Sequence, residues 1–330
     1  MSVAPENRIL RELLAAGPRW ISGASLAKTL GVSRVSIWHH MERLRAQGFE
    51  LEAKSARGYR LSSEPRLLHA GLVEAHLKVR RKAFSFTILD QIDSTNDEAA
   101  RQLASGRTAP FAVFARRQTR GRGRFGRVWH SEANGNLYSS FAFRPRVAPE
   151  KMQTFTLWMG VTLCDLVSKF VPAAPGIKWP NDIVFDGRKA GGILTEARVD
   201  ADQIRDLVFG LGLNVNSPAG GWPRELARHA VSLAEIAGRP VDLNRLTAAL
   251  IGRVLLASER FADGEHLDQF ADLWNRHDVL RGRPVTVIES GRRHTGTAAG
   301  VDDVGSLLLR DERGRTRRFR AGEVTIEKGQ

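Results

Sequence analysis

The pattern of apolar residues changes twice along the chain, and this change divides the chain into more than one domain. Residues 1–66 have the pattern of short helices and a hairpin, residues 67–277 mix strands and helices, and residues 278–330 have the pattern of strands alone. A length of 330 residues agrees with two or three domains. We therefore expect domains at 1–66, 67–277 and 278–330, in an α+β fold overall.

Composition excludes several classes of protein. With 42% hydrophobic and 26% charged residues, the chain can bury a core. The longest apolar run, 155–164, is too short to span a membrane, and the N-terminus meets a charge at Glu6 without a signal-peptide run. The single cysteine, Cys164, allows no internal disulfide and no zinc site of paired cysteines, so we expect a cytoplasmic protein. The net charge of +14 favours polyanionic partners, although a GC-biased genome would also enrich arginine over lysine.

The first 66 residues have the pattern of a winged helix-turn-helix. Asn7 and Ser33 are expected to cap the first and third helices, and Ser22 or Gly23 to open the second. The expected helices are 8–16, 24–30 and 34–47, followed by hairpin strands 49–52 and 59–61.

The third helix is expected to contact DNA. Ile37, Met41 and Leu44 form its core stripe, which leaves the opposite face for the major groove. Winged helices also serve as protein-binding modules, but eleven Lys and Arg against six Asp and Glu favour DNA. Adjacent His39 and His40 point to different faces, and no residue is assigned as a metal ligand. The DNA-binding candidates are Arg34, Val35, Ser36, His39 and Arg43 on the helix, with Lys54 and Arg57 in the wing.

The middle and last regions differ in their expected secondary structure. The expected strands of the middle region are 84–89, 111–116, 137–143, 183–185, 190–197 and 207–215, and its expected helices are 97–105, 154–170, 243–261 and 267–276. The order is not a regular βαβ alternation, which favours antiparallel hairpins. Strands expected at 284–289, 293–301, 305–310, 315–320 and 324–327 predict a small barrel.

Residues 118–127 form a loop rich in arginine and glycine that contains the letters of a dinucleotide-binding motif. That motif requires its glycines to open a helix, and no amphipathic helix follows here. A solvated nucleic-acid tether is a second alternative, but the loop lies between two expected core strands. We expect a loop whose arginines close over a phosphate or carboxylate, with glycines that allow close backbone approach.

A lysine is expected beside a carboxylate. Residues 178–182 (Lys-Trp-Pro-Asn-Asp) precede one strand, and Lys189 begins the return strand, so Lys189 should lie near Asp182. This arrangement suits an anionic transition state such as attack on a phosphate. Upstream, Thr95 and Glu98 have the spacing of a capping box, while the Ser94 and Thr95 hydroxyls suit a polar ligand.

Taken together, these motifs resemble those of the biotin protein ligases, and the whole chain resembles the bifunctional type that also represses the biotin operon. The motifs occur in the family's order and with its spacing, and any one of them alone is weak. They are Asp93–Asn96, Gln118 with Gly121–Arg127, Lys178–Asp182, Lys189–Leu194 and Gly210–Asn214. The winged helix and the terminal barrel extend the resemblance over nearly the whole chain.

The resemblance implies a fold, a reaction and its partners. The central domain would be related to class II aminoacyl-tRNA synthetases, and the last domain would be an SH3-like barrel. Biotin and ATP with Mg²⁺ would give biotinyl-5′-adenylate, from which biotin passes to a lysine of a biotin carboxyl carrier protein. The adenylate-bound form would dimerise and bind a two-fold operator DNA.

The resemblance also implies roles for single residues. The implied biotin set is Ser94, Thr95, Asn96, Gln118, Arg122, Gly123, Arg124 and Lys189. The implied adenylate set is Gly121, Arg124, Trp129, Asn181, Lys189 and Asn214, and the implied catalytic set is Lys189, Arg122, Arg124 and Asp182. Three alternatives stay open: a ligase whose first domain does not repress, a lipoate ligase on the same fold, and a transcription factor with a sensor domain and no catalysis.

Overall fold

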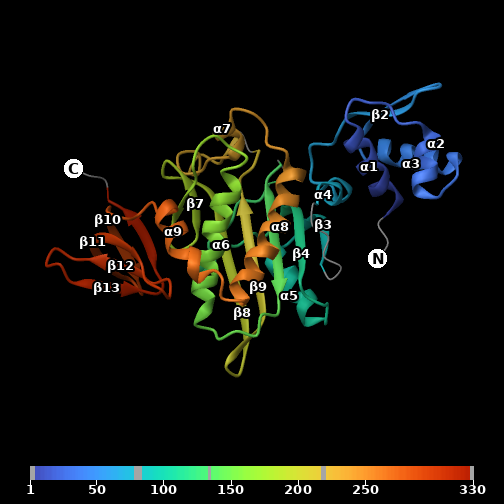
Figure 1. The fold of residues 1–330 in the computed structure, drawn as a ribbon. Helices are drawn as coiled ribbons and strands as arrows, with labels where there is room; N and C mark the ends of the chain where they lie inside the picture. The colour runs from blue at the N-terminus through green and yellow to red at the C-terminus, as the bar shows by residue number, and fades with distance from the viewer. Residues whose placement is uncertain (1–3, 78–83, 133–134, 217–220, 328–330) are drawn as a thin grey trace. The chain divides into compact units, whose positions relative to one another are not determined.

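The computed structural model describes residues 4–77, 84–132, 135–216 and 221–327 (Figure 1). The chain divides into two compact units, residues 1–80 with 242–249, and residues 81–241 with 250–330. The outermost residues of the expected first and last domains lie outside the described residues. No helix in the described part of the chain is both long and apolar enough to cross a membrane.

The first unit is a helix-turn-helix with a two-stranded wing. A buried core of Ile9, Leu26, Ile37 and Met41 holds the helices together, and Leu72 of a fourth helix joins it. The elements are α1 (Pro5–Ala16), α2 (Gly23–Leu30), α3 (Arg34–Ala46), β1 (Glu50–Lys54), β2 (Gly58–Ser63) and α4 (Ala70–His76). β1 and β2 pair antiparallel, as expected of a wing.

Local capping explains where these helices begin. Ser22 and Ser33 accept hydrogen bonds from the backbone N–H groups of Ser25 and Ser36, as predicted. The cap predicted at Asn7 is wrong, because α1 begins at Pro5. The Asn7 amide instead donates to Glu74 Oε2 at 2.6 Å, so it ties α1 to α4.

A seven-stranded sheet forms the centre of the second unit. Its order is β3-β4-β5-β9-β8-β7-β6, and every neighbouring pair is antiparallel except β3 and β4. The strands are β3 (Ser85–Ile92), β4 (Phe111–Gln118), β5 (Leu137–Phe143), β6 (Gly176–Lys178), β7 (Asp182–Phe185), β8 (Arg188–Asp200) and β9 (Gln203–Leu213). The helices are α5 (Thr95–Ala104), α6 (Lys151–Val167), α7 (Leu233–Ala237), α8 (Leu243–Ala262), which continues from the first unit, and α9 (Leu267–His277).

Helices cover both faces of this sheet because its strands are apolar on both sides. Val113 and Ala142 pack against Ala99 and Leu103 of α5. Side chains alternate along a strand, so the neighbouring Phe114 and Phe141 face the other side. There Phe141 continues through Phe209 to Phe155 of α6 in a chain of aromatic contacts. Figure 1 shows α6 lying across the sheet.

The last strands form a separate antiparallel sheet. The order is β13-β12-β11-β10-β14, with β10 (Pro284–Glu289), β11 (Arg292–Val301), β12 (Leu307–Arg310), β13 (Thr316–Phe319) and β14 (Glu323–Ile326). All five strands match expected ones. No ladder joins β13 to β14 among the described residues, so the structure shows a five-stranded sheet, and its closure into a barrel stays a prediction.

The mixed α+β organisation is confirmed, and two strands, β5 and β10, have the predicted bounds. Four short elements of the described chain were not predicted: α4, the 3-10 turn η1 (Arg124–Gly126), β6 and α7. The capping box predicted for Thr95 and Glu98 is wrong. Ser94 caps α5 by accepting from the Asp97 N–H at 3.4 Å, and Thr95 is the first helical residue.

We predict that Phe141→Ala lowers the free energy of unfolding of the second unit by about 3–5 kcal/mol. Phe141 is fully buried, and its ring centroid lies 5.8 Å from that of Phe114 in an edge-to-face contact. Urea denaturation followed by the fluorescence of buried Trp158 and Trp179 measures the change. Leu256→Ala, at a side chain that is 43% exposed, is the control and should change stability by about 0.5 kcal/mol or less. Equal effects of the two substitutions would contradict the assigned core.

Candidate active site

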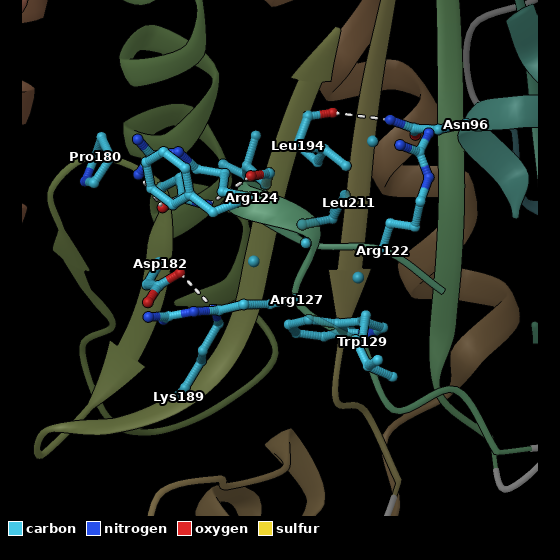
Figure 2. A pocket seen from close by; sticks show the side chains of 18 of the residues that line it. Asn96, Arg122, Arg124, Arg127, Trp129, Pro180, Asp182, Lys189, Leu194 and Leu211 are labelled. Atoms are coloured by element: carbon cyan, nitrogen blue, oxygen red, sulfur yellow. Dashed lines mark hydrogen bonds and ion pairs between the residues drawn. The ribbon is translucent and has the colours of Figure 1, made fainter. Parts of the chain in front are cut away.

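A pocket of about 370 Å³ opens on the central sheet (Figure 2). Its walls come from α5, the arginine–glycine loop, the β6–β7 turn, strands β8 and β9, and a segment at β14. The lining residues proposed from sequence are Ser94, Thr95, Asn96, Gln118, Arg122, Gly123, Arg124, Trp129, Asn181, Asp182 and Lys189. The sheet and the loop therefore bring the separate motifs of the sequence to one place.

Glycines of β8 and β9 make the floor of the pocket. A Cβ atom at Gly212 would lie 2.4 Å from Cε2 of Trp129, and one at Gly192 would lie 2.9 Å from Cζ3 of the same ring. Only strands without side chains at these positions can carry the indole. The Trp129 Nε1 atom is buried and has no hydrogen-bond partner among the described residues, so the ring offers a flat face and an unused donor.

Lys189 lies beside Asp182, as the sequence predicts. Its Nζ atom lies 2.6 Å from Asp182 Oδ1 and 5.3 Å from the centroid of the Trp129 ring. Figure 2 shows the Lys189 and Asp182 side chains meeting at one side of the pocket. An ammonium group held by a carboxylate and an aromatic face is kept in a defined position, where it can meet an anion.

The backbone around Lys189 is fixed by buried hydrogen bonds. The Lys189 carbonyl accepts from the Val231 N–H at 3.0 Å and from the Asn214 Nδ2 at 3.2 Å. Asn214 also donates to the Val231 carbonyl. Asn214 is not among the residues that line the pocket, and its side chain bonds to the backbone carbonyl of Lys189.

The loop arginines are each paired with an acceptor of the protein. Arg122 lies 2.5 Å from Asp97 Oδ1 and 3.2 Å from Glu196. Arg124 donates to Asn181 Oδ1 at 3.4 Å and to the Gly322 carbonyl at 3.3 Å. Burial lowers the pKa of the Arg124 guanidinium from its ordinary value, although the charges of Asp182 and Glu323 oppose the shift. Arg124 is therefore a half-buried cation aimed at the pocket.

Arg127 and Gly121, at the two ends of this loop, contact neighbouring parts of the protein. Arg127 forms an ion pair with Glu323, so the loop is joined to the last sheet. Gly121 is not among the residues that line the pocket. A Cβ at Gly121 would lie 2.5 Å from Ser131 Oγ, so this glycine allows the loop backbone to pass close to its neighbour.

A hydrogen-bond network closes the polar end of the pocket. Gln118 Oε1 accepts from the backbone N–H of Thr95 at 2.8 Å and from its hydroxyl at 3.1 Å. Ser140 Oγ lies 2.8 Å from Thr95 Oγ1 and donates to Asn96 Oδ1 at 2.6 Å. Asn96 Nδ2 donates in turn to Glu196 Oε2 at 2.7 Å. These groups hold one another and present a fixed set of donors and acceptors.

Several lining residues were not identified from sequence. They include Lys178, Ser139, the strand residues 210–212 and the segment 322–325. Burial lowers the pKa of the Lys178 ammonium, with Asp182 opposing this shift. Lys178 and residues 210–212 belong to motifs found in the sequence, whereas the sequence pattern of 322–325 gave no sign that this segment lines a pocket on the central sheet.

In the first unit, some residues proposed to contact DNA are exposed, and others contact side chains of the same unit. Arg34, Val35, His39 and Arg57 are exposed. The Ser36 backbone N–H donates to Ser33 Oγ, and the two hydroxyl oxygens lie 2.9 Å apart. Lys54 Nζ lies 5.4 Å from the centroid of the Trp20 ring. The exposed face of α3 therefore carries most of the proposed donors.

Arg43 is held by two groups of its own unit. It donates from Nε to Glu6 at 2.6 Å and lies 2.6 Å from His40 Nδ1. A contact between Arg43 and DNA would have to replace or share these partners.

Comparison with known families matches each part of the chain. The model of the biotin/lipoate A/B protein ligase family matches residues 88–214. A model of an HTH domain matches residues 6–60, and the model of the biotin protein ligase C terminal domain matches residues 281–326.

Individual relatives cover most of the chain. The bifunctional ligase/repressor BirA of Bacillus subtilis (strain 168) is 34% identical over 304 residues, which are 91% of this chain and 92% of the relative. That of Escherichia coli (strain K12) is 30% identical over 330 residues, or 97% of this chain and 98% of the relative. The biotin protein ligase of Aquifex aeolicus, solved in complex with biotin and ATP, is 26% identical with a TM-score of 0.63, covering 74% of this chain and 99% of that one.

We predict that Gly212→Ala displaces Trp129 and lowers the free energy of unfolding by about 1–3 kcal/mol, because the added methyl group overlaps the indole. Thermal denaturation and tryptophan fluorescence measure the two effects. Gly252→Ala in α8 is the matched control, since no atom lies within 4 Å of its added Cβ. The control should stabilise the helix by about 0.5–1 kcal/mol. A Gly212→Ala protein as stable as the control would refute the close contact.

Proposed function

The chain belongs to the biotin/lipoate A/B protein ligase family, and from that premise we propose that it is a biotin protein ligase and a biotin-responsive repressor. It activates biotin with ATP and transfers the biotinyl group to a specific lysine of a biotin carboxyl carrier protein. The observation that carries the proposal is the meeting of Lys189, Arg124 and Asn181 around one pocket above Trp129.

The first step joins two anions. A carboxylate oxygen of biotin attacks the α-phosphorus of ATP, an O–P bond forms, and pyrophosphate leaves. Negative charge grows on the α-phosphoryl oxygens, and cations placed there lower the barrier. We propose that Lys189 and Arg124 supply this charge, while Arg122 leaves Asp97 and Glu196 to meet the biotin carboxylate.

The second step is an acyl transfer. The uncharged amine of the carrier lysine attacks the carbonyl carbon of the adenylate, a C–N bond forms, and the C–O bond to AMP breaks with loss of one proton. Asp182 lies beside Lys189 and is proposed to orient either that lysine or the incoming amine. Closure of the 121–127 loop would exclude water, which otherwise hydrolyses the mixed anhydride.

We propose the remaining binding roles with the positions of the residues in the pocket as support. Ser94, Thr95, Asn96, Gln118 and Gly123 are proposed to bind biotin through the polar end of the pocket. Trp129 and Asn181 are proposed to contact the adenylate. Gly121 and Asn214 are proposed to act indirectly, by shaping the loop and by fixing the backbone of Lys189.

Mg²⁺ suits a pocket that takes a triphosphate, because it binds phosphate together with one or two carboxylates. Asp182 and Glu323 line the pocket, and they are the carboxylates that would hold the ion. Each already has a cationic partner, so most of the ion's ligands would come from the nucleotide and water. When bound, Mg²⁺ neutralises phosphate charge.

Further features of the proposal rest on family membership. The central domain is proposed to be related to class II synthetases, and the last sheet to an SH3-like barrel. The adenylate-bound form is proposed to dimerise, so that two winged units match a two-fold operator in the cytoplasm. Adenylate and DNA would then each strengthen binding of the other by the same factor.

Lys189→Ala should lower the rate of carrier biotinylation at least about 100-fold, because a positioned cation at the reacting phosphate is removed. Incorporation of labelled biotin into the carrier measures the overall reaction, and pyrophosphate release measures the first step. Lys169→Ala, remote from the pocket and 60% exposed, is the control and should keep full activity. Labelling that survives Lys189→Ala would remove the catalytic assignment. Lipoate offered in place of biotin separates the two ligase classes.

Arg34→Ala should weaken binding to operator DNA by about tenfold or more, the usual effect of losing a base or phosphate contact. The measurement is a titration with DNA from upstream of the biotin genes of its own genome, with and without biotin and ATP. Arg276→Ala on α9, also an exposed arginine, should leave binding unchanged. Specific binding only in the presence of both substrates supports a ligand-coupled repressor. No specific binding in either state leaves the second candidate, a ligase that does not repress.

A further inference from the structure

Three potential metal ligands converge in the first unit, and none of them lines the ligase pocket. Glu64 follows β2, His76 ends α4, and Asp242 directly precedes α8. One ligand atom from each residue lies within 4.8 Å of the other two. Glu64 and His76 are half-buried, so two of the three groups meet in a partly dehydrated position.

His76 offers a ring nitrogen that no protein group occupies in the described part of the chain. This atom is Nε2, and it is buried. Burial also lowers the pKa of the imidazole from its ordinary value. A neutral imidazole nitrogen is a ligand, whereas its protonated form is not.

The two carboxylates repel each other. Burial and the charge of Asp242 together raise the pKa of Glu64, because both disfavour a second negative charge there. A bound divalent cation would reverse that effect, since both carboxylates would then face positive charge. The repulsion between Glu64 and Asp242 is therefore relieved by the same ion that His76 can ligate.

One carboxylate oxygen of Asp242 caps a helix, and the other is available to a metal ion in competition with an arginine. Its Oδ1 accepts from the backbone N–H groups of Asn244 and Arg245, each at 3.0 Å, and so caps α8. Its Oδ2 lies 3.2 Å from Arg245 Nε, and the Arg245 side chain is 64% exposed. An ion at Oδ2 would compete with this single exposed guanidinium.

The segments that carry the three residues are held near one another by other bonds. Asn244 Oδ1 accepts from the His69 N–H at 2.8 Å, and its Nδ2 donates to the Leu67 carbonyl at 3.2 Å. The chain between Glu64 and His76 is thereby fixed to the first turn of α8. The backbone segments that carry the ligands are thus positioned before any ion arrives, which favours binding.

We propose that Glu64, His76 and Asp242 form a binding site for a divalent transition-metal ion of the Zn²⁺ class. One imidazole nitrogen and two carboxylate oxygens suit Zn²⁺, with water as the fourth ligand. Tetrahedral ligands at ordinary bond lengths lie about 3.4 Å apart, so small side-chain rotations complete the site. The ion clamps the segment after the wing to the start of α8, and the site is independent of the ligase chemistry.

Equilibrium dialysis of the full chain against Zn²⁺, with metal analysis, tests the proposal. We expect one Zn²⁺ per chain and an affinity that falls at least tenfold in each of Glu64→Gln, His76→Gln and Asp242→Asn. Asparagine also caps helices, so Asp242→Asn retains the start of α8. Arg245→Gln removes the competing cation and should raise the affinity about threefold. Co²⁺ should give the visible absorption of a low-coordinate site, and His76→Gln should abolish it.

Matched controls separate this site from adventitious binding. Glu50→Gln in the wing and His229→Gln, both at exposed residues, should leave the Zn²⁺ affinity unchanged. Zn²⁺ should also raise the melting temperature of the wild-type chain but not that of the double variant Glu64→Gln, His76→Gln. Failure to bind one equivalent of Zn²⁺ would overturn the proposal, and so would binding that persists in the double variant.

Discussion

The contact between Trp129 and the glycines of β8 and β9 is the constraint on which the pocket depends. An indole can lie on a sheet only where the strands below it carry no side chains, and Gly192 and Gly212 provide that surface. The ring then sets the height of the arginine–glycine loop above the sheet and supplies one face against Lys189. A larger residue at either glycine would move the ring, the loop and the ammonium group together.

An anionic ligand that enters the pocket must displace carboxylate groups of the protein to pair with some of the pocket's cations. Arg122, Arg127 and Lys189 are each held by a carboxylate of the protein. An anionic ligand exchanges one carboxylate partner for another group, and its net gain is the difference between the two interactions. Arg124, by contrast, donates only to neutral oxygens among the bonds described above, so an anionic ligand can gain its charge without displacing a carboxylate.

Much of the fold and the site was predictable, and the failures have physical causes. Strand β5 was predicted with correct bounds because its run of apolar and small residues lies between turns, and Lys189 was correctly placed because a two-residue turn fixes its partner strand. Asn7 was a good cap by residue type, yet Pro5 starts the helix earlier and Glu74, 67 residues away, takes the amide. Likewise, Gln118 draws Thr95 away from capping. These choices depend on long-range partners, and local patterns do not contain them.

The walls of the pocket are supplied by stretches of chain that are distant in sequence, and the segment 322–325 comes from a different sheet from the rest. A break in the connection between α9 and β10 would leave Lys189 and the arginine loop on one fragment and this last wall on the other. Neither fragment would then enclose the cavity alone. Two fragments cut at this connection could therefore serve as a split reporter. Ligase activity would return only when the two fragments associate and complete the pocket.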